Sequence, residues 1–440
     1  MHFKLPPIDP TLTFQDQDIF QRRDFAKSLS KIVTSTTDSL VISLESQWGD
    51  GKTSFVHKWL NDLRANQNNV PCLYIDAYKN DFQNDPFLLI SAEIYTYAAK
   101  KISDGAEATT SFANQVKEVS GAITKGTLKT AITFASGGFF ADEQFDNLEK
   151  NIGAELGKIS DKYVDDALKK HAEKNKTIED LKTKLSELAR ALGDNKPLVV
   201  VIDELDRCRP TFALEFLETI KHLFSAEHVI FVLVNNPDQL EESVRAQYGR
   251  DVDAGGYLRK FYDLSFSLPK GEDFRITDSE LHRFTCEVFE HIYGELSDTL
   301  ESWAYMISML SQRLSLSLRD IQKICLILSI AQTSSSYRRD DYAINTTLHV
   351  GLAVIALKDR ELLKDLYQSG GSWLQFKEFF KCETLDDTDE KHFDEIWHSV
   401  LDPSYTISID LEGLASYMNA LRQQHNFLSQ RIAPFFSLRI

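Results

Sequence analysis

The sequence has few cysteines and no long uninterrupted apolar stretch. Its five cysteines stand far apart among 440 residues, and no two of them form a Cys-x-x-Cys pair. This spacing excludes a disulfide framework and a cysteine-rich zinc site, and it indicates reduced thiols in a cytoplasmic protein. The most apolar segment, residues 131–141, is far shorter than the ~20 residues that a membrane-spanning helix needs. Its length leads us to expect no transmembrane segment. The N-terminus lacks the apolar region of a signal peptide, so we expect no signal peptide either.

Positive charge is also scarce. The chain carries 49 Lys and Arg against 66 Asp and Glu, a net charge of −17. This balance disfavours a broad surface for nucleic acid or anionic membrane, and there is no basic stripe with interleaved aromatic residues. The histidines form no His-x3-His or His-Glu-x-x-His motif, and no Gly-x-Ser-x-Gly elbow is present. The missing motifs give no indication of zinc-protease or serine-hydrolase chemistry. The acidic charge balance makes nucleic acid an unlikely partner.

The composition that remains is that of an ordinary globular chain. Hydrophobic residues make up 42% and charged residues 26% of the sequence, which is typical of folded domains. Apolar runs of strand length alternate with longer amphipathic stretches of helical period. The expected strands are the apolar run that begins at Leu40, then Val70–Tyr78, Pro197–Ile202 and His228–Val234. The expected helices before and between them include Asp18–Val33, Pro86–Ala98, Pro210–Phe224 and Gln239–Tyr248. This alternation predicts an α/β fold with a parallel sheet.

Changes in composition divide the chain into four expected parts. Residues 1–100 and 173–270 carry the strands and together form one sheet domain. Residues 101–172 are rich in Lys, Glu, Ala and Gly and have weak periodicity, so we interpret them as a polar, partly helical insertion into that domain. From about residue 270 the strand pattern stops, and 271–440 is expected to be a helical lid or effector region.

A Gly-punctuated turn follows the first strand and opens at once into a helix. Its sequence is Trp48-Gly49-Asp50-Gly51-Lys52-Thr53-Ser54. In this context the backbone N–H groups and the helix N-terminus point at an anion, so the turn predicts a phosphate-binding loop. Lys52 is then expected to reach the β- and γ-phosphates and Thr53 to ligate Mg²⁺. Ser46 replaces the usual first glycine of the motif, and a Gly-rich turn with a surface lysine is the alternative.

Paired carboxylates follow the third expected strand. Asp203 and Glu204 stand at its carboxyl end, the edge of an α/β sheet where ligands bind. A nucleotide site needs one carboxylate near Mg²⁺, the role expected for Asp203, and a base that orients the attacking water, the role expected for Glu204. Alone, the pair is also compatible with a solvated strand end. Together with the glycine turn, in this order along the chain, it predicts a nucleoside triphosphate site.

Three more residues are candidates with open alternatives. Asn235 stands at the end of the next strand. It is either a sensor that hydrogen-bonds the attacking water or the γ-phosphate, or part of an ordinary Asn-Pro turn. Arg319, near a helix start, is either a γ-phosphate ligand that couples the lid to the nucleotide or a solvated surface residue. Phe20, with its neighbour Ile19, is expected beside the nucleotide base or simply in the core.

At these positions the sequence resembles the KAP-type P-loop NTPases. The resemblance covers about residues 15–330, and its most specific part is the run Asp203-Glu204-Leu205-Asp206-Arg207-Cys208-Arg209-Pro210. It implies ATP as the nucleotide, Mg²⁺ at Thr53 and Asp203, and Arg207 as a signature residue that acts on phosphate or on a neighbouring subunit. The expected fold class is therefore α/β: a P-loop NTPase parallel sheet of the additional-strand type, with a helical insertion and a C-terminal α-helical domain.

The chain departs from the family pattern in three places besides its polar insertion. Ser46 replaces a glycine, Glu204 stands where a second aspartate is common, and Asn235-Asn236 replaces a usual aspartate. Many members carry membrane helices where this chain has 101–172, so it resembles a soluble member. Bacterial members include proteins that exclude phage, which suggests a role in antiviral defence.

Two functional hypotheses follow. The first is an ATPase that uses hydrolysis as a conformational switch, acting on a protein partner or through self-association. The second is a nucleotide-gated scaffold that binds a membrane surface or a partner through 101–172 without significant hydrolysis. Turnover that is lost in Glu204→Gln distinguishes the first from the second.

Overall fold

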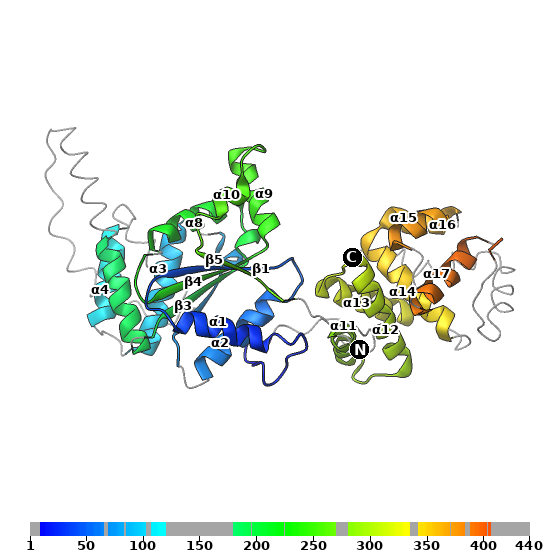
Figure 1. Cartoon of the computed structure of the whole chain (residues 1–440), viewed down its shortest axis with the longest axis horizontal. Helices are drawn as coiled ribbons and strands as arrows, with labels where there is room; N and C mark the ends of the chain where they lie inside the picture. The colour runs from blue at the N-terminus through cyan, green and yellow to red at the C-terminus, as the bar shows by residue number, and fades with distance from the viewer. Residues whose placement is uncertain are drawn as a thin grey trace.

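The fold consists of a sheet region and a helical region that follow each other along the chain (Figure 1). The computed structural model describes residues 9–65, 69–82, 85–102, 107–119, 179–194, 196–223, 225–269, 280–334, 342–369, 371–382, 388–402 and 404–405. Across these residues, no helix is both long enough and apolar enough to cross a membrane.

The sheet has five parallel strands in the order β2-β3-β4-β1-β5. Their bounds are β1 Leu40–Glu45, β2 Cys72–Asp76, β3 Leu198–Asp203, β4 Val229–Asn235 and β5 Leu264–Ser267. Strand β4 lies between β1, which leads into the glycine turn, and β3, which ends in the paired carboxylates. This is the additional-strand arrangement, so the expected fold class is confirmed. Strand β5 was not expected, because it is short and largely exposed and has no apolar run.

Alternate residues of the buried strands face two separate cores. On β3, Val199 and Val201 face the core under helices α1 (Arg23–Thr34) and α2 (Lys52–Ala65). The residues between them face the opposite core, as the two-residue period of a strand requires. The helices that contribute to this second core include α3 (Pro86–Lys101), α8 (Pro210–Leu223), α9 (Pro237–Tyr248), α10 (Ala254–Leu258) and the helix at 179–193.

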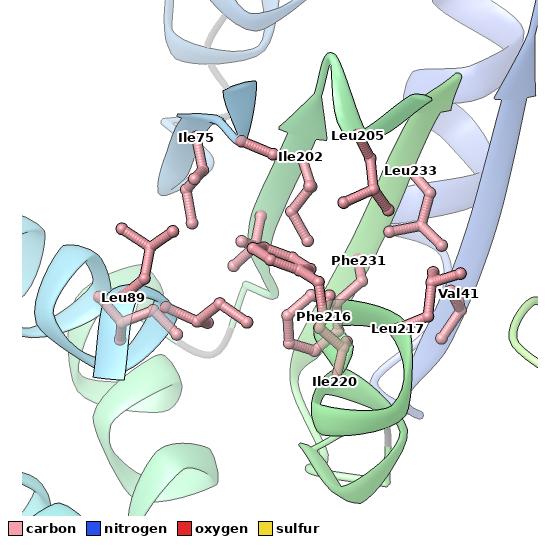
Figure 2. Close-up of a cluster of buried hydrophobic side chains, with 14 of the residues drawn as sticks. Val41, Ile75, Leu89, Ile202, Leu205, Phe216, Leu217, Ile220, Phe231 and Leu233 are labelled. Carbon is pink, nitrogen blue, oxygen red and sulfur yellow. The ribbon is translucent and has the colours of Figure 1, made fainter. Parts of the chain in front are cut away.

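Helix α8 shows how the second core is filled. Its Phe216, Leu217 and Ile220 lie over the sheet beside Phe231 and Leu233 of β4 (Figure 2). All five side chains are almost completely buried. Helices on both faces bury β3 and β4 completely, which explains why these two strands appear in the sequence as continuous apolar runs.

Helix starts in the sheet region follow local capping chemistry. Asp85 caps α3 by accepting from the Leu88 N–H, and a proline stands at the first turn. Helix α1 begins at Arg23, five residues later than expected, because Asp18 lies ahead of the helix and binds its first backbone N–H groups from there. The Asp18 carboxylate accepts from the backbone N–H groups of Arg22 and Arg23. Ile19 and Phe20 therefore stand in a turn ahead of the helix.

Only the beginning of the expected insertion is described. Helix α4 (Glu107–Val119) packs on the second core through Phe112 and Val116. Residues 120–178, including the apolar segment 131–141, lie outside the described residues, and the boundaries of the insertion stay a prediction.

After β5, all the regular structure that is described is helical. The helices are α11 Glu280–Tyr293, α12 Asp298–Leu314, α13 Leu318–Ser334, α14 Tyr342–Lys358, α15 Arg360–Ser369, α16 Trp373–Phe380 and α17 Thr388–Leu401. They enclose a third core of their own that shares no residue with the cores of the sheet region. The expected helical C-terminal region is therefore confirmed over the described residues, while residues 406–440 lie outside them.

Candidate functional site

The loop between β1 and α2 wraps around the ammonium group of Lys52. Gly49 and Gly51 have φ angles of +91° and +84°, which side-chain-bearing residues rarely adopt. Lys52 Nζ donates to the carbonyl oxygens of Ser46 at 2.7 Å and Gln47 at 3.0 Å. The loop therefore turns back over the N-terminus of α2, where backbone N–H groups favour an anion.

Ser46 is accommodated without the glycine that the motif usually has. It does not have a positive φ, so no glycine is needed there. Its hydroxyl donates to Asp50 Oδ2 at 2.6 Å and its N–H to the Asn235 carbonyl at 3.2 Å. Serine thus braces the loop internally and ties it to β4.

Asp203 is the most buried carboxylate of the site, with 1% of its surface exposed. One oxygen accepts from the Thr53 hydroxyl at 2.8 Å and from the Tyr74 hydroxyl at 3.1 Å, and the other accepts from the Glu204 N–H at 2.8 Å. Burial raises the pKa of Asp203, and these hydrogen bonds partly oppose the rise. The contact of Thr53 with Asp203 joins the glycine loop to the end of β3.

Glu204 lies next to this contact with a left-handed backbone at φ +62°. Its Oε1 is 3.5 Å from the Thr53 hydroxyl, and its Oε2 pairs with the guanidinium of Arg207. Burial raises the pKa of Glu204 and the charge of Asp203 adds to the rise, while Arg207 opposes it. Burial also lowers the pKa of Lys52, an effect that the surrounding carboxylates oppose.

Trp48 and Asp206 complete the cluster around the loop. The Trp48 indole N–H donates to Asp206 Oδ2, and the Arg207 guanidinium carbon lies 6.0 Å from the centroid of the Trp48 ring. Asp206 is 7% exposed, and its Oδ1 has no hydrogen-bond partner. The structure therefore joins Thr53, Asp203, Glu204, Arg207 and Trp48 by a chain of contacts. Lys52 is close enough for the carboxylate charges to act on its pKa, but its own hydrogen bonds go to the loop.

A cavity of about 410 Å³ extends from the glycine loop along α2. Its walls include Phe20 and Ile19 from the turn before α1, and Phe284, Leu318 and Arg319 from the helical region. The Phe20 and Phe284 rings lie 5.8 Å apart. Two candidates assigned by sequence, Phe20 and Arg319, therefore face the same space as the loop although they are far apart in the chain.

Asn235 is placed differently from the other candidates. It is 3% exposed and does not line the cavity. Its amide donates to the Ser43 hydroxyl on β1 at 3.1 Å and to the Leu233 carbonyl at 3.4 Å. In this arrangement the side chain bridges two strands beneath the loop.

Three residues of the site carried no signal in the sequence. Tyr74 reaches Asp203 from β2, and Lys58 lies nearly buried in the cavity wall with its ammonium on the Gln17 carbonyl at 2.8 Å. Arg22 donates to the carbonyls of Asp50 and Pro269, both at 2.9 Å, and burial lowers its pKa to about 10. These contacts join distant parts of the chain, so neither periodicity nor a motif identifies them.

The donor set fits Mg²⁺ bound together with a phosphate. Among the described residues there is no group of three or more His, Cys, Asp or Glu side chains that could hold a metal ion by themselves. Thr53 and Asp203 supply one hydroxyl and one carboxylate in contact. Mg²⁺ typically keeps water and phosphate oxygens and takes only one or two protein oxygens, so this small oxygen set is sufficient.

Comparison with known families gives one finding. The family model described as the KAP family P-loop domain matches residues 22–334, a span that runs from just before α1 to the end of α13. A search of curated proteins returned no match. The matched span contains both the glycine loop and the carboxylate run, together with the first three helices of the helical region.

Proposed function

The chain belongs to the KAP family of P-loop NTPases, and from that premise we propose that it binds and hydrolyses ATP to switch the conformation of its helical region. The observation that carries the proposal is the contact of Thr53 with Asp203 beside Lys52 and Glu204. These four side chains have the chemistry that phosphoryl transfer to water needs: a cation for the phosphates, a metal site, and a base.

Each residue of the loop and the carboxylate pair has a role in this proposal. The backbone of Trp48–Ser54 holds the phosphate chain, and Lys52 exchanges the carbonyls of Ser46 and Gln47 for β- and γ-phosphate oxygens. Thr53 and Asp203 would hold Mg²⁺, which when bound would neutralise phosphate charge. Glu204 orients the attacking water and takes its proton; the raised pKa of Glu204 makes it a stronger base than an exposed glutamate.

The remaining candidates have supporting roles. Of the cations that line the cavity, Arg207 of the carboxylate run and Arg319 of the helical region are proposed to stabilise charge on the γ-phosphate. Phe20 and Ile19 offer an apolar wall for the base. Asn235 acts as a sensor only after its amide leaves Ser43, so among the assigned residues it has the least direct support.

The proposed switch rests on where the cavity lies. Its walls come from both the sheet region and helices α11 and α13, and the two regions have separate hydrophobic cores. A nucleotide in the cavity would contact both regions, so its hydrolysis changes the contacts that hold them together. The partner on which this movement acts is a protein or a second copy of the chain.

Turnover of wild type, Lys52→Ala and Glu204→Gln, measured beside ATP binding and molecular size, tests the proposal. We expect Lys52→Ala to lose tight ATP binding. We expect Glu204→Gln to bind ATP normally with kcat reduced about 100- to 10,000-fold, the range for a lost general base. Full ATPase activity in Lys52→Ala would contradict the proposal.

The scaffold alternative and the defence role stay hypotheses. The scaffold hypothesis depends on residues 101–172, most of which lie outside the described residues, and measurable turnover that Glu204→Gln abolishes excludes its non-hydrolysing form. The defence role comes from the family alone. Its test is phage plating on bacteria that express wild type or Lys52→Ala, with protection expected only from wild type.

A further inference from the structure

Trp48 connects the phosphate loop to the candidate base through Arg207. Its indole ring lies under the Arg207 guanidinium, with 6.0 Å from the guanidinium carbon to the ring centroid. The Nε of the same guanidinium pairs with Glu204 Oε2. One planar cation therefore contacts an aromatic face of the loop and the carboxylate that is proposed to activate water.

The indole itself is held in place from its other side. Its N–H donates to Asp206, which is 7% exposed and belongs to the short turn after β3. Asp206 Oδ1 has no hydrogen-bond partner, so the Trp48 N–H is an important stabilising contact for a nearly buried carboxylate. The ring position is thus determined by the carboxylate run and not by the loop alone.

The backbone of Glu204 has an unfavourable conformation, so contacts with neighbouring residues must hold this residue in place. Its φ of +62° is a conformation that a non-glycine residue adopts only when its surroundings hold it. Beyond the Thr53 hydroxyl at 3.5 Å, the Arg207 ion pair is the contact that orients its carboxylate. Arginine suits this task because its planar group can stack on an aromatic ring while its N–H groups bind a carboxylate.

We propose that Trp48 is a positioning residue for Glu204, acting through Arg207, so that the phosphate loop itself determines where the base stands. This inference rests on the proposed function. Because Trp48 directly precedes Gly49, phosphates that settle in the loop act on the residue that orients Arg207. Binding of the triphosphate and alignment of the water-activating carboxylate are thereby coupled within a single loop.

The first test separates chemistry from binding in two Trp48 variants. Trp48→Ala removes both the ring and the N–H, and we expect kcat for ATP hydrolysis to fall about 10- to 100-fold, as a misplacement of about 1 Å can cause. ATP affinity should change little, because the side chain does not hold the phosphates. Trp48→Phe keeps a ring under Arg207 but loses the bond to Asp206, so its kcat should lie between wild type and Trp48→Ala.

The second test asks whether the effect passes through Arg207. If it does, adding Trp48→Ala to Arg207→Ala should reduce kcat no further than Arg207→Ala alone, because the contact is already gone. The matched control is Tyr248→Ala, which removes another exposed aromatic residue whose polar group bonds a carboxylate, here Glu218 at 3.2 Å. Its kcat should equal that of wild type.

Three outcomes would overturn the inference. The first is an unchanged kcat in Trp48→Ala, and the second is a loss of activity in Trp48→Ala that weaker ATP binding explains completely. The third is a double variant whose kcat falls by the product of the two single-variant factors. Each of these requires a wild type that hydrolyses ATP. A wild type without ATP binding or turnover instead contradicts the proposed function, so the two failures are distinguishable.

Discussion

Single residues of the site are charged groups held away from water. Burial raises the pKa of Asp203 and Glu204 and lowers that of Lys52. Each group therefore costs free energy by itself, and their opposite charges offset part of that cost. Removing one charge leaves the others without compensation, which is why a variant such as Glu204→Gln must be tested for folding as well as for turnover.

Glu93 on α3 gives a prediction at the same scale outside the site. Burial raises its pKa from 4.5 to about 7. Its folded pKa exceeds the unfolded one, so its stabilising contribution is fully present below pH 4.5 and is lost as the pH rises through about 7. Glu93→Gln stays neutral, and we expect its stability relative to wild type to grow by about 1–2 kcal/mol between pH 5 and pH 8.

Urea denaturation at both pH values measures this difference. Glu107→Gln, an exposed glutamate on the neighbouring helix α4, is the control and should show no such growth. A constant difference between Glu93→Gln and wild type at the two pH values would contradict the prediction.

At the scale of elements, the phosphate loop and the start of α13 fit closely together. A Cβ on Gly49 would lie 2.6 Å from Ser317 Oγ and 3.1 Å from Arg319 Cβ. Both the positive φ and the contact with the helical region therefore require glycine at this position. The loop that is proposed to bind phosphate is therefore also in close contact with the start of α13, and Arg319 of that helix lines the cavity.

Gly49→Ala should therefore be more harmful than backbone strain alone explains. Gly249→Ala is the matched control, because Gly249 has φ +101° and no heavy atom within 4 Å of a Cβ built there. We expect thermal denaturation to show that Gly249→Ala lowers the free energy of unfolding by about 1–2 kcal/mol, the cost of backbone strain. Gly49→Ala should lower it clearly more. Adding Ser317→Gly to Gly49→Ala should recover the excess, and no recovery would show that α13 does not determine this glycine.

At the scale of the whole molecule, the sheet region and the helical region are stabilised separately. Their cores share no residue, and contacts between the regions are largely at the cavity, among them Phe20 with Phe284 and Gln17 with Glu287. Regions with separate hydrophobic cores can move relative to each other unless a large apolar interface joins them. A ligand in the cavity is thus well placed to change how the two regions are held.

The ion pair of Arg313 with Asp394 tests the independence of the helical region. It joins α12 to α17 through two 2.9 Å hydrogen bonds, and the side chains are only 5% and 14% exposed. Arg313→Leu leaves Asp394 uncompensated, so we expect the helical region to lose about 3 kcal/mol. Calorimetry should show a lower unfolding temperature for the helical region. ATP binding should be retained at temperatures below that transition.

The control for this prediction is Arg190→Leu. It breaks the exposed pair with Glu227, whose side chains are 46% and 65% exposed, and it should cost less than about 1 kcal/mol. A uniform loss across a single transition in Arg313→Leu would show that the two regions unfold as one unit.

The sequence by itself determined the fold class, the order of strands and helices up to β4, and the residues of the glycine loop and the carboxylate run. These features depend on neighbours along the chain: apolar runs for buried strands, a helical period for their covering helices, and glycine spacing for a loop. Cap chemistry is also local, although the start of α1 at Arg23 was misplaced because Asp18 was interpreted as helical.

The tertiary structure alone decided the contacts that turn these motifs into a site. Trp48 meets Asp206 across 158 positions, and Arg22 meets the Asp50 carbonyl across 28. The approach of Thr53 to Asp203, by contrast, was expected from the two motifs. Three further features also depend on the tertiary structure: strand β5, the hydrogen bond of Tyr74 with Asp203 and the close approach of α13 to Gly49. Such contacts follow from how the strands pair and how the helices pack on them, and no pattern of neighbouring residues records which distant partner a side chain will meet.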